Sequence, residues 1–174
     1  MPPQKIIFVL GGAASGKSTY AESLVTKADE RPVYLATAEA RDEEMFEKIA
    51  KHRARRGEEW RDVACPRDVA GAVSGLERGD IALLDCATMW LTNVMLAEGD
   101  VAAETQALLS ALRTSPAPVV VVSNEVGQGI VPEHRLGRRF REAQGRLNQD
   151  LAALADTVVL VVAGLPLALK GTLP

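Results

Sequence analysis

Residues 11–18 carry a motif whose residue types and spacing are suited to holding phosphate. They read Gly-Gly-Ala-Ala-Ser-Gly-Lys-Ser, which matches Gly-x-x-x-x-Gly-Lys-Ser. Glycines let backbone N–H groups curl around phosphate oxygens, and a following helix adds the positive end of its dipole. In such a loop Lys17 reaches the β- and γ-phosphates, and the Ser18 hydroxyl helps to hold Mg²⁺. The alternative is a glycine-rich turn with an incidental lysine, but an expected strand before the motif and helix after it favour a phosphate loop.

Asp85 is the second candidate, because it directly follows the apolar run 81–84. A carboxylate at the end of a parallel strand emerges at the edge of the sheet where ligands of α/β folds bind, so Asp85 is placed to hold Mg²⁺ through water. Its alternative role is that of a turn or N-cap residue before a helix expected to start at Thr88. Of the two roles, the metal role is favoured.

His52 lies in a basic segment, residues 51–56, which reads Lys-His-Arg-Ala-Arg-Arg at the end of an expected helix. A neutral imidazole is a competent nucleophile toward phosphorus, and neighbouring guanidinium groups stabilise negative charge on phosphoryl oxygens. This combination suits covalent nucleotidyl transfer. From these residues alone a plainer alternative is favoured, in which they meet the negative end of the helix dipole and face solvent. The other histidine, His134, is expected at the entry of a long helix and is assigned no chemistry.

Apolar runs alternate with amphipathic stretches along the chain. Runs rich in Val, Ile and Leu predict buried strands at 5–10, 33–37, 81–85, 119–123 and 157–163. Helices are expected at 17–28, 42–55, 69–76, 88–97, 102–112 and 135–156. This alternation, together with the phosphate loop, predicts an α/β fold of the P-loop NTPase type, with a doubly wound, mostly parallel sheet and helices on both faces. Residues 127–132 are expected to form a loop, and the tail at 166–171 is expected to be a surface segment.

Size and composition indicate one ordinary globular domain, expected to span residues 1–174. The formal net charge of −3 provides no field for binding nucleic acid, which is therefore not expected as a partner. Cys65 and Cys86 are far apart, so they indicate buried thiols rather than a disulfide framework or a zinc site. The first ten residues are too short for a signal peptide or a membrane span, so we expect a cytoplasmic location.

Taken together, these motifs resemble one family, the bifunctional adenosylcobinamide kinases and adenosylcobinamide-phosphate guanylyltransferases of cobalamin biosynthesis. The resemblance covers nearly the whole chain. Besides the phosphate loop, it rests on Tyr-Leu-Ala-Thr-Ala at 34–38, Asp-Glu-Glu-Met at 42–45 followed by His52 and Trp60, Leu-Asp-Cys-x-Thr at 84–88, Trp-Leu-Thr-Asn at 90–93, Ser-Asn-Glu-Val-Gly at 123–127, Gly-Ile-Val-Pro at 129–132, Gly-Arg-Leu-Asn-Gln at 145–149 and Ala-Gly-Leu-Pro at 163–166.

The resemblance implies two reactions. The first is phosphorylation of the aminopropanol hydroxyl of adenosylcobinamide by ATP or GTP, with Mg²⁺. The second is transfer of GMP from GTP to adenosylcobinamide phosphate, which gives adenosylcobinamide-GDP and releases pyrophosphate. In the family this transfer passes through a guanylylated histidine, and the matching position here is His52, which reverses the preference stated above.

The site residues implied by the motifs and by the resemblance fall into three groups. The catalytic residues are His52 and Lys17, and the metal residues are Ser18 and Asp85. The nucleotide contacts are Gly11, Gly12, Ala13, Ala14, Ser15, Gly16, Lys17, Ser18, Ala36, Thr37, Ala38, Arg53, Ala54, Arg55, Arg56 and Asp85. Asn124 and Glu125 are further candidates for contacts with substrate or nucleotide, with no assigned role. The resemblance also implies a homotrimer with active sites near subunit contacts.

Two positions depart from the family pattern. Members usually have proline in the place of Gly57 and glutamate in the place of Ala64. Gly57 is expected to loosen the turn after the basic segment. Ala64 lacks a carboxylate, so guanine selectivity or affinity is expected to be weaker here. Neither position is the nucleophile or part of the phosphate loop, so we expect both reactions to be retained.

Two other functions are alternatives at this stage. A monofunctional small-molecule kinase needs the phosphate loop and Mg²⁺ but no histidine nucleophile. A GTP-dependent switch protein would carry Asn-Lys-x-Asp to recognise guanine, whereas residues 123–126 read Ser-Asn-Glu-Val. The sequence therefore disfavours a switch protein.

Overall fold

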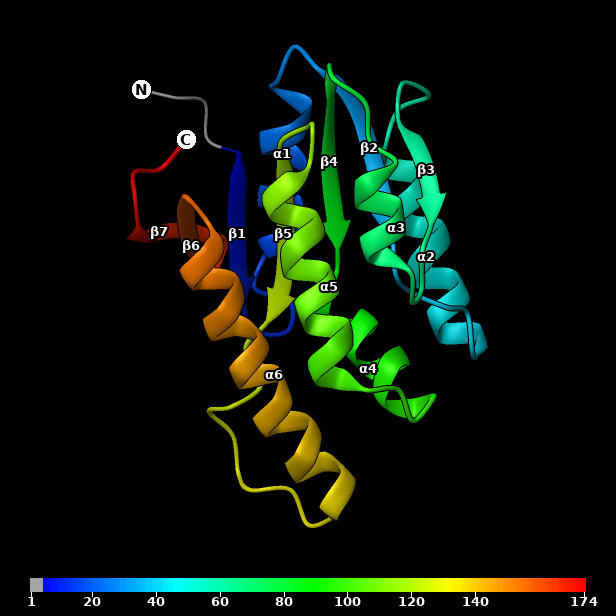
Figure 1. Ribbon diagram of the computed structural model, residues 1–174, viewed down its shortest axis with the longest axis vertical. Helices are drawn as coiled ribbons and strands as arrows, with labels where there is room; N and C mark the ends of the chain where they lie inside the picture. Colours follow the sequence, from blue (N-terminus) through cyan, green and yellow to red (C-terminus); the bar gives the residue numbers. More distant parts are fainter. Residues whose placement is uncertain (1–4) are drawn as a thin grey trace.

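The computed structural model describes residues 5–174, and their strands form a seven-stranded sheet flanked by helices (Figure 1). The strand order is β3-β2-β4-β5-β1-β6-β7. All neighbouring pairs are parallel except β6 and β7, which are antiparallel. The predicted mostly parallel α/β sheet is therefore confirmed. The strands are β1 (Ile6–Gly11), β2 (Arg31–Ala36), β3 (Arg61–Ala64), β4 (Asp80–Asp85), β5 (Val119–Asn124), β6 (Thr157–Val162) and β7 (Leu165–Lys170).

Helices cover both faces of this sheet, as predicted, because alternate strand residues point to opposite sides. Phe8 of β1 packs in a core with buried residues of α3, α4, α5 and α6, whereas its neighbour Val9 packs in a second core with Ala21 and Val25 of α1. The helix α2 buries no residue of its own, which leaves it the most loosely packed helix near the sheet edge. The helices are α1 (Lys17–Thr26), α2 (Glu43–Arg55), α3 (Val69–Ser74), α4 (Ala87–Leu96), α5 (Val101–Thr114) and α6 (Arg135–Leu154).

Two strands were not predicted from the sequence. The edge strand β3 is short and reads Arg-Asp-Val-Ala, so it has no apolar run to reveal it. The strand β7 forms most of the tail at 166–171, which lies at the surface as predicted. Its exposed Leu165, Leu167 and Leu169 alternate along an edge strand that pairs only with β6. The loop 127–132 is irregular, as predicted.

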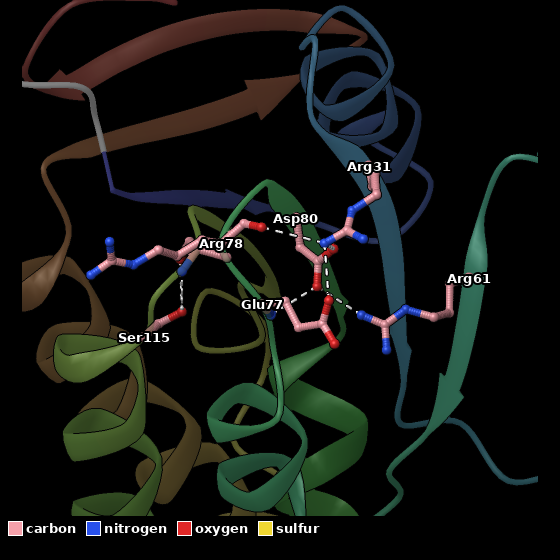
Figure 2. Close-up of polar contacts among 7 residues, drawn as sticks. Arg31, Arg61, Glu77, Arg78, Asp80 and Ser115 are labelled. Atoms are coloured by element: carbon pink, nitrogen blue, oxygen red, sulfur yellow. Dashed lines mark hydrogen bonds and ion pairs between the residues drawn. The ribbon is translucent and has the colours of Figure 1, made fainter.

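Asp80 links the amino ends of three neighbouring strands through ion pairs (Figure 2). Its carboxylate is almost fully buried, and its oxygens lie 3.0 Å from Nη2 of Arg31 and 2.7 Å from Nη2 of Arg61. The backbone N–H of Glu77 also donates to it, over 2.9 Å. Because Arg31, Arg61 and Asp80 begin β2, β3 and β4, this cluster fixes these strands at the edge opposite the phosphate loop.

None of the helices within residues 5–174 combines the length and the apolar character needed to cross a membrane.

Candidate active site

The phosphate loop joins β1 to α1 and has the backbone shape that its glycines allow. Gly16 is the N-cap of α1 and has a φ of 90°, in the left-handed region that favours glycine. A Cβ at this position would also lie 3.1 Å from the Cα of Gly164. The backbone N–H of Gly164 donates to the carbonyl of Ser15 over 2.8 Å, which ties the loop to the turn between β6 and β7.

Lys17 lies inside this loop and is half-buried. Its Nζ donates to the carbonyl oxygen of Gly12 over 3.0 Å. Burial lowers the pKa of Lys17 below its usual value, and the nearby Cys86 and Asp85 act in the opposite direction. The ammonium therefore faces the same end of the sheet as Asp85.

A pocket of about 710 Å³ opens over the carboxyl ends of β2, β4 and β5. It brings together residues from the phosphate loop, from strand ends and from α2, which the sequence spreads over more than a hundred positions. The predicted site residues that line it are Ala13, Ala14, Lys17, Ser18, Ala36, Ala38, His52, Arg53, Arg56 and Asp85, and Asn124 joins them.

The other predicted residues do not line this pocket. Gly11, Gly12, Ser15 and Gly16 form the rest of the loop, so they shape it through their backbone. Thr37 is fully buried, and its Oγ1 donates to the carbonyl of Cys86 over 2.8 Å and accepts from the N–H of Cys86 over 2.7 Å. The Thr37 side chain thus joins the ends of β2 and β4.

Two residues of the basic segment also lie away from the pocket lining. Ala54 is exposed. Arg55 places Nη2 3.1 Å from Nδ1 of His52 and 3.4 Å from Oε1 of Glu22 on α1. Arg55 therefore contacts the histidine and the helix that follows the phosphate loop.

Asp85 ends β4, as the sequence predicted, and faces the pocket together with Ser18. Its alternative role as a helix N-cap is taken by Cys86, whose Sγ accepts from the backbone N–H of Met89 over 3.4 Å. Burial, reinforced by the Asp85 carboxylate, raises the pKa of the Cys86 thiol to about 12. Both Cys86 and Cys65 are buried and free, which confirms the prediction for the cysteines.

Sequence reasoning did not single out Tyr34 and Asp62, which hold Arg56 in the pocket. The Arg56 guanidinium carbon lies 3.4 Å from the centroid of the Tyr34 ring, and Nη2 lies 3.2 Å from Oδ1 of Asp62. Trp60 packs against the same ring in a T-shaped arrangement, with centroids 6.2 Å apart. Tyr34 belongs to a segment that supported the family resemblance, so that segment carried a usable signal. Asp62 lies in the strand β3, which was not predicted, and no sequence signal pointed to it.

Asn124 is presented to the pocket by a buried polar network behind it. Its N–H donates to Oγ1 of Thr88 over 2.8 Å, and its carbonyl accepts from Nδ2 of Asn148 over 3.2 Å. Oδ1 of Asn148 in turn accepts from Ser123 over 2.7 Å and from Gln144 over 2.9 Å. Asn124 also lies beside Gly11 in the register of β1 and β5, so the network fixes it next to the phosphate loop.

Residues 7–169 match a family described as cobinamide kinase / cobinamide phosphate guanyltransferase. Over 166 residues the chain is 43% identical to the bifunctional adenosylcobalamin biosynthesis protein CobP of Pseudomonas aeruginosa, and the alignment covers 94% of this chain and 96% of that protein. Over 181 residues it is 42% identical to the bifunctional adenosylcobalamin biosynthesis protein CobU of Salmonella typhimurium, which covers 95% and 99% of the two proteins.

The fold is similar to that of a prototypical ATPase from the type III secretion system of pathogenic bacteria. The TM-score is 0.58 at 12% identity, and the match covers 94% of this chain and 56% of that protein. At this identity the likeness concerns the fold alone, and it agrees with the P-loop NTPase type predicted from the sequence.

Proposed function

This chain belongs to the cobinamide kinase / cobinamide phosphate guanyltransferase family, and we propose that it carries out both reactions in the pocket shared by the phosphate loop and α2. It is a bifunctional transferase of adenosylcobalamin biosynthesis. Its first substrate is adenosylcobinamide, whose aminopropanol hydroxyl accepts a phosphoryl group from ATP or GTP. Its second reaction joins GMP from GTP to the resulting phosphate and releases pyrophosphate.

One observation carries this proposal: His52 and Lys17 line the same pocket. A monofunctional kinase needs only the loop, Lys17 and an acceptor pocket. Here α2 adds a nucleophile, His52, together with the cation Arg53 and, directly after the helix, Arg56, to the space where a triphosphate would lie. This arrangement supports guanylyl transfer in addition to phosphorylation.

In the kinase reaction the protein mainly positions the reactants and offsets charge. The backbone amides of the phosphate loop and the Lys17 ammonium hold the β- and γ-phosphates. The substrate hydroxyl attacks the γ-phosphorus, and the bond from that phosphorus to the bridging oxygen breaks. Asn124 lies at the end of β5 beside the loop, within the same pocket, where it supplies a fixed amide to nucleotide or acceptor.

Mg²⁺ fits the oxygen donors that this pocket offers. Ser18 supplies a hydroxyl and Asp85 a carboxylate, and Mg²⁺ is usually bound by one or two such groups together with substrate phosphates. Within residues 5–174 no group of three or more His, Cys, Asp or Glu residues is arranged to hold a metal by itself. When bound, the ion neutralises charge on the triphosphate.

In the second reaction the His52 imidazole attacks the α-phosphorus of GTP, and pyrophosphate leaves. Arg53 and Arg56 then stabilise charge on the phosphoryl oxygens. An oxygen of adenosylcobinamide phosphate attacks the same phosphorus and releases His52. Ala64 presents a methyl group to this pocket where the family pattern has a carboxylate, so Arg56 and Asp62, which line the same pocket, are the polar groups beside it for the guanine nucleotide.

We propose a homotrimer, supported by the family resemblance and by the exposed Ile130, Val131 and Leu136, which lie on the loop before α6 and on its first turn, away from the sheet (Figure 1). Light scattering of the purified protein tests the subunit number. We also propose a cytoplasmic location, where nucleoside triphosphates are available, and cell fractionation tests it.

The deciding experiment uses GTP labelled at the α-phosphate. The protein is incubated with it and Mg²⁺, denatured, and tested for label that is stable in alkali and labile in acid, as a phosphoramidate is. The substitution His52→Asn should abolish the label, while His134→Asn should keep it. The His52→Asn variant should still phosphorylate adenosylcobinamide from γ-labelled nucleotide. Equal labelling of His52→Asn would refute the role of His52, and phosphorylation without any GMP adduct in the unsubstituted protein would leave only the kinase activity.

A further inference from the structure

The contacts of His52 indicate a control of its reactivity. Its Nδ1 lies 3.1 Å from Nη2 of Arg55 and 3.9 Å from Oε1 of Glu22. The same Arg55 nitrogen lies 3.4 Å from that Glu22 oxygen. Glu22 belongs to α1, the helix that follows the phosphate loop, whereas His52 and Arg55 belong to α2. We call these residues the Glu22–Arg55–His52 cluster.

We propose that Glu22 and Arg55 set the tautomer of His52, and that Glu22 is the positioning residue that makes the histidine nucleophilic. The inference rests on the proposed function, because it concerns the histidine that attacks GTP. The family resemblance placed Arg55 among the nucleotide contacts, and the inference gives it a different task.

The donor and acceptor character of the three groups decides which ring nitrogen of His52 carries the proton. A guanidinium has donors and no acceptor, so when Arg55 donates to Nδ1 the ring proton must lie on Nε2. Nε2 then has no lone pair with which to attack phosphorus. A carboxylate only accepts, so when Glu22 pairs with Nδ1 the ring proton must lie on Nδ1. Nε2 then has a free lone pair, and it is the nitrogen that the cluster leaves to the pocket.

The observed distances favour the unreactive arrangement, with Arg55 the nearer partner of Nδ1. Glu22 already contacts Arg55. Its carboxylate can therefore pair with that guanidinium and also accept a hydrogen bond from a protonated Nδ1 of the imidazole. His52 and Arg55 lie on the same helix, so a shift of α2 moves them together and changes their distance from Glu22 on α1, whereas a turn of the imidazole toward a bound nucleotide separates Nδ1 from Arg55. The loosely packed α2, with no buried residue, is suited to such a shift.

The burial of Glu22 distinguishes this cluster from an ordinary surface ion pair. Only 15% of its side chain is exposed, and the side-chain oxygens of Glu22 have no other partner than Arg55 and His52 within residues 5–174. Exposed ion pairs on a helix surface contribute little, whereas a carboxylate largely removed from water interacts more strongly with a neighbouring proton. The position of Glu22 on α1 also links the imidazole to the same helix that begins at the phosphate loop.

The chemical step balances with this tautomer. The Nε2 lone pair forms the bond to the α-phosphorus while the bond from that phosphorus to the leaving pyrophosphate oxygen breaks. The proton stays on Nδ1, so the guanylylated ring carries a positive charge that the Glu22 carboxylate offsets. In the next step the acceptor phosphate oxygen attacks the phosphorus, the nitrogen–phosphorus bond breaks, and the lone pair returns to Nε2. No separate base is required.

Nitrogen NMR tests the tautomer without any turnover. The chain has two histidines, so in ¹⁵N-histidine protein carrying His134→Gln the only imidazole is that of His52. At mildly alkaline pH, Glu22→Leu should increase the fraction with the proton on Nε2, and Arg55→Met should increase the fraction with the proton on Nδ1. Glu47→Leu, which removes an exposed carboxylate from α2, is the matched control and should leave both nitrogen shifts unchanged. Unchanged shifts in both Glu22→Leu and Arg55→Met would overturn the inference.

Single-turnover labelling with α-labelled GTP tests the consequence. Glu22→Leu should slow formation of the acid-labile adduct by about 10- to 100-fold, by analogy with the loss when the group that orients a metal-bound imidazole is removed. The isosteric Glu22→Gln, whose amide oxygen still accepts, should lose less, and phosphorylation of adenosylcobinamide should persist in both variants. Adduct formation at the unsubstituted rate, or an equal loss of both activities, would overturn the inference. No adduct in the unsubstituted protein would overturn the proposed function instead, and the NMR comparison would still decide the tautomer.

Discussion

The guanidinium of Arg56 stacks on the ring of Tyr34, with its central carbon 3.4 Å from the ring centroid. The Arg56 side chain is 6% exposed, and one of its nitrogens pairs with Asp62. The other two nitrogens, Nε and Nη1, are buried and have no hydrogen-bond partner within the described residues 5–174. Arginine is suited to paired recognition of acceptors, and unpaired buried donors destabilise the protein that holds them. Arg56 thus lines the pocket with a charge that Tyr34 and Asp62 hold in place, while two of its donors are unpaired.

Replacement of Arg56 with methionine should therefore weaken nucleotide binding more than it weakens the fold. Hydrogen bonds to charged groups contribute about 1.5–3 kcal/mol, so the dissociation constant for GTP should rise roughly 10- to 100-fold. The unfolding free energy should change by less than about 1 kcal/mol, because loss of the stack on Tyr34 is offset by removal of buried unpaired donors. Calorimetric titration and urea unfolding measure the two effects. Arg139→Met, at an exposed position of α6, is the control, and an unchanged GTP affinity in Arg56→Met would contradict the role.

Much of the candidate site was predictable because its signals are local. The phosphate loop and Lys17 follow from one continuous motif, and Asp85 follows from its place after a buried apolar run. The alternation of runs also predicted the parallel sheet, since a strand covered on both faces is apolar at nearly every position. The edge strands β3 and β7 were not predicted, because an edge strand is covered on one face at most. Polar or exposed residues therefore interrupt the buried apolar run by which a strand is recognised.

Contacts between distant elements were not predictable in the same way. The residues around His52 favoured a solvated helix end, and only the family resemblance reversed that preference. The approach of α2 to α1, which brings Arg55 and His52 to Glu22, depends on docking of a helix with no buried residue, and such docking leaves no periodic apolar signal. The stack of Arg56 on Tyr34 joins the end of α2 to β2. It could not be predicted from the sequence either, because it also depends on where α2 docks.

Lys17→Met should lower the kinase rate by about 10²- to 10³-fold, the typical loss of one preorganised group that stabilises developing charge. Burial lowers the pKa of Lys17 below 10.5, so the free protein loses this ammonium at a lower pH than an ordinary lysine would. Because the charged form binds the triphosphate, nucleotide affinity should fall as the pH rises through that lowered pKa. The pH dependence of GTP binding measures this, and Lys17→Met should lack the alkaline decline. The same decline in Lys17→Met would assign it to another group.

Asn148→Leu should destabilise the protein by about 3 kcal/mol, because it leaves more than one buried polar group without a partner. Ser123 and Gln144 lose the oxygen to which they donate, and the carbonyl of Asn124 loses its donor. Urea unfolding measures the loss. Gln149→Leu, one position further on the exposed face of α6, should change stability by no more than about 0.5 kcal/mol. Similar values for the two variants would show that the network does not hold the end of β5.

Cys65 and Cys86 should both resist alkylation in the native protein at mildly alkaline pH. Burial is the main cause that raises the pKa of Cys65 to about 11 and that of Cys86 to about 12. Since the thiolate is the reactive form and a raised pKa keeps the thiol protonated, each should react at least about 100-fold more slowly than a free cysteine, whose pKa is about 8.5.

Mass spectrometry after a timed exposure to iodoacetamide measures the modification of each thiol, and protein unfolded in guanidinium, where both should react quickly, is the control. Cys86 is the sharper test, because it lines the same pocket as Lys17 and Asp85 and its backbone N–H and carbonyl both bond to Thr37. Fast modification of native Cys86, with Cys65 protected, would show that the junction between β2 and β4 opens to solvent. The floor of the pocket would then be a mobile segment, and the fixed placement of Asp85 beside the phosphate loop would no longer hold.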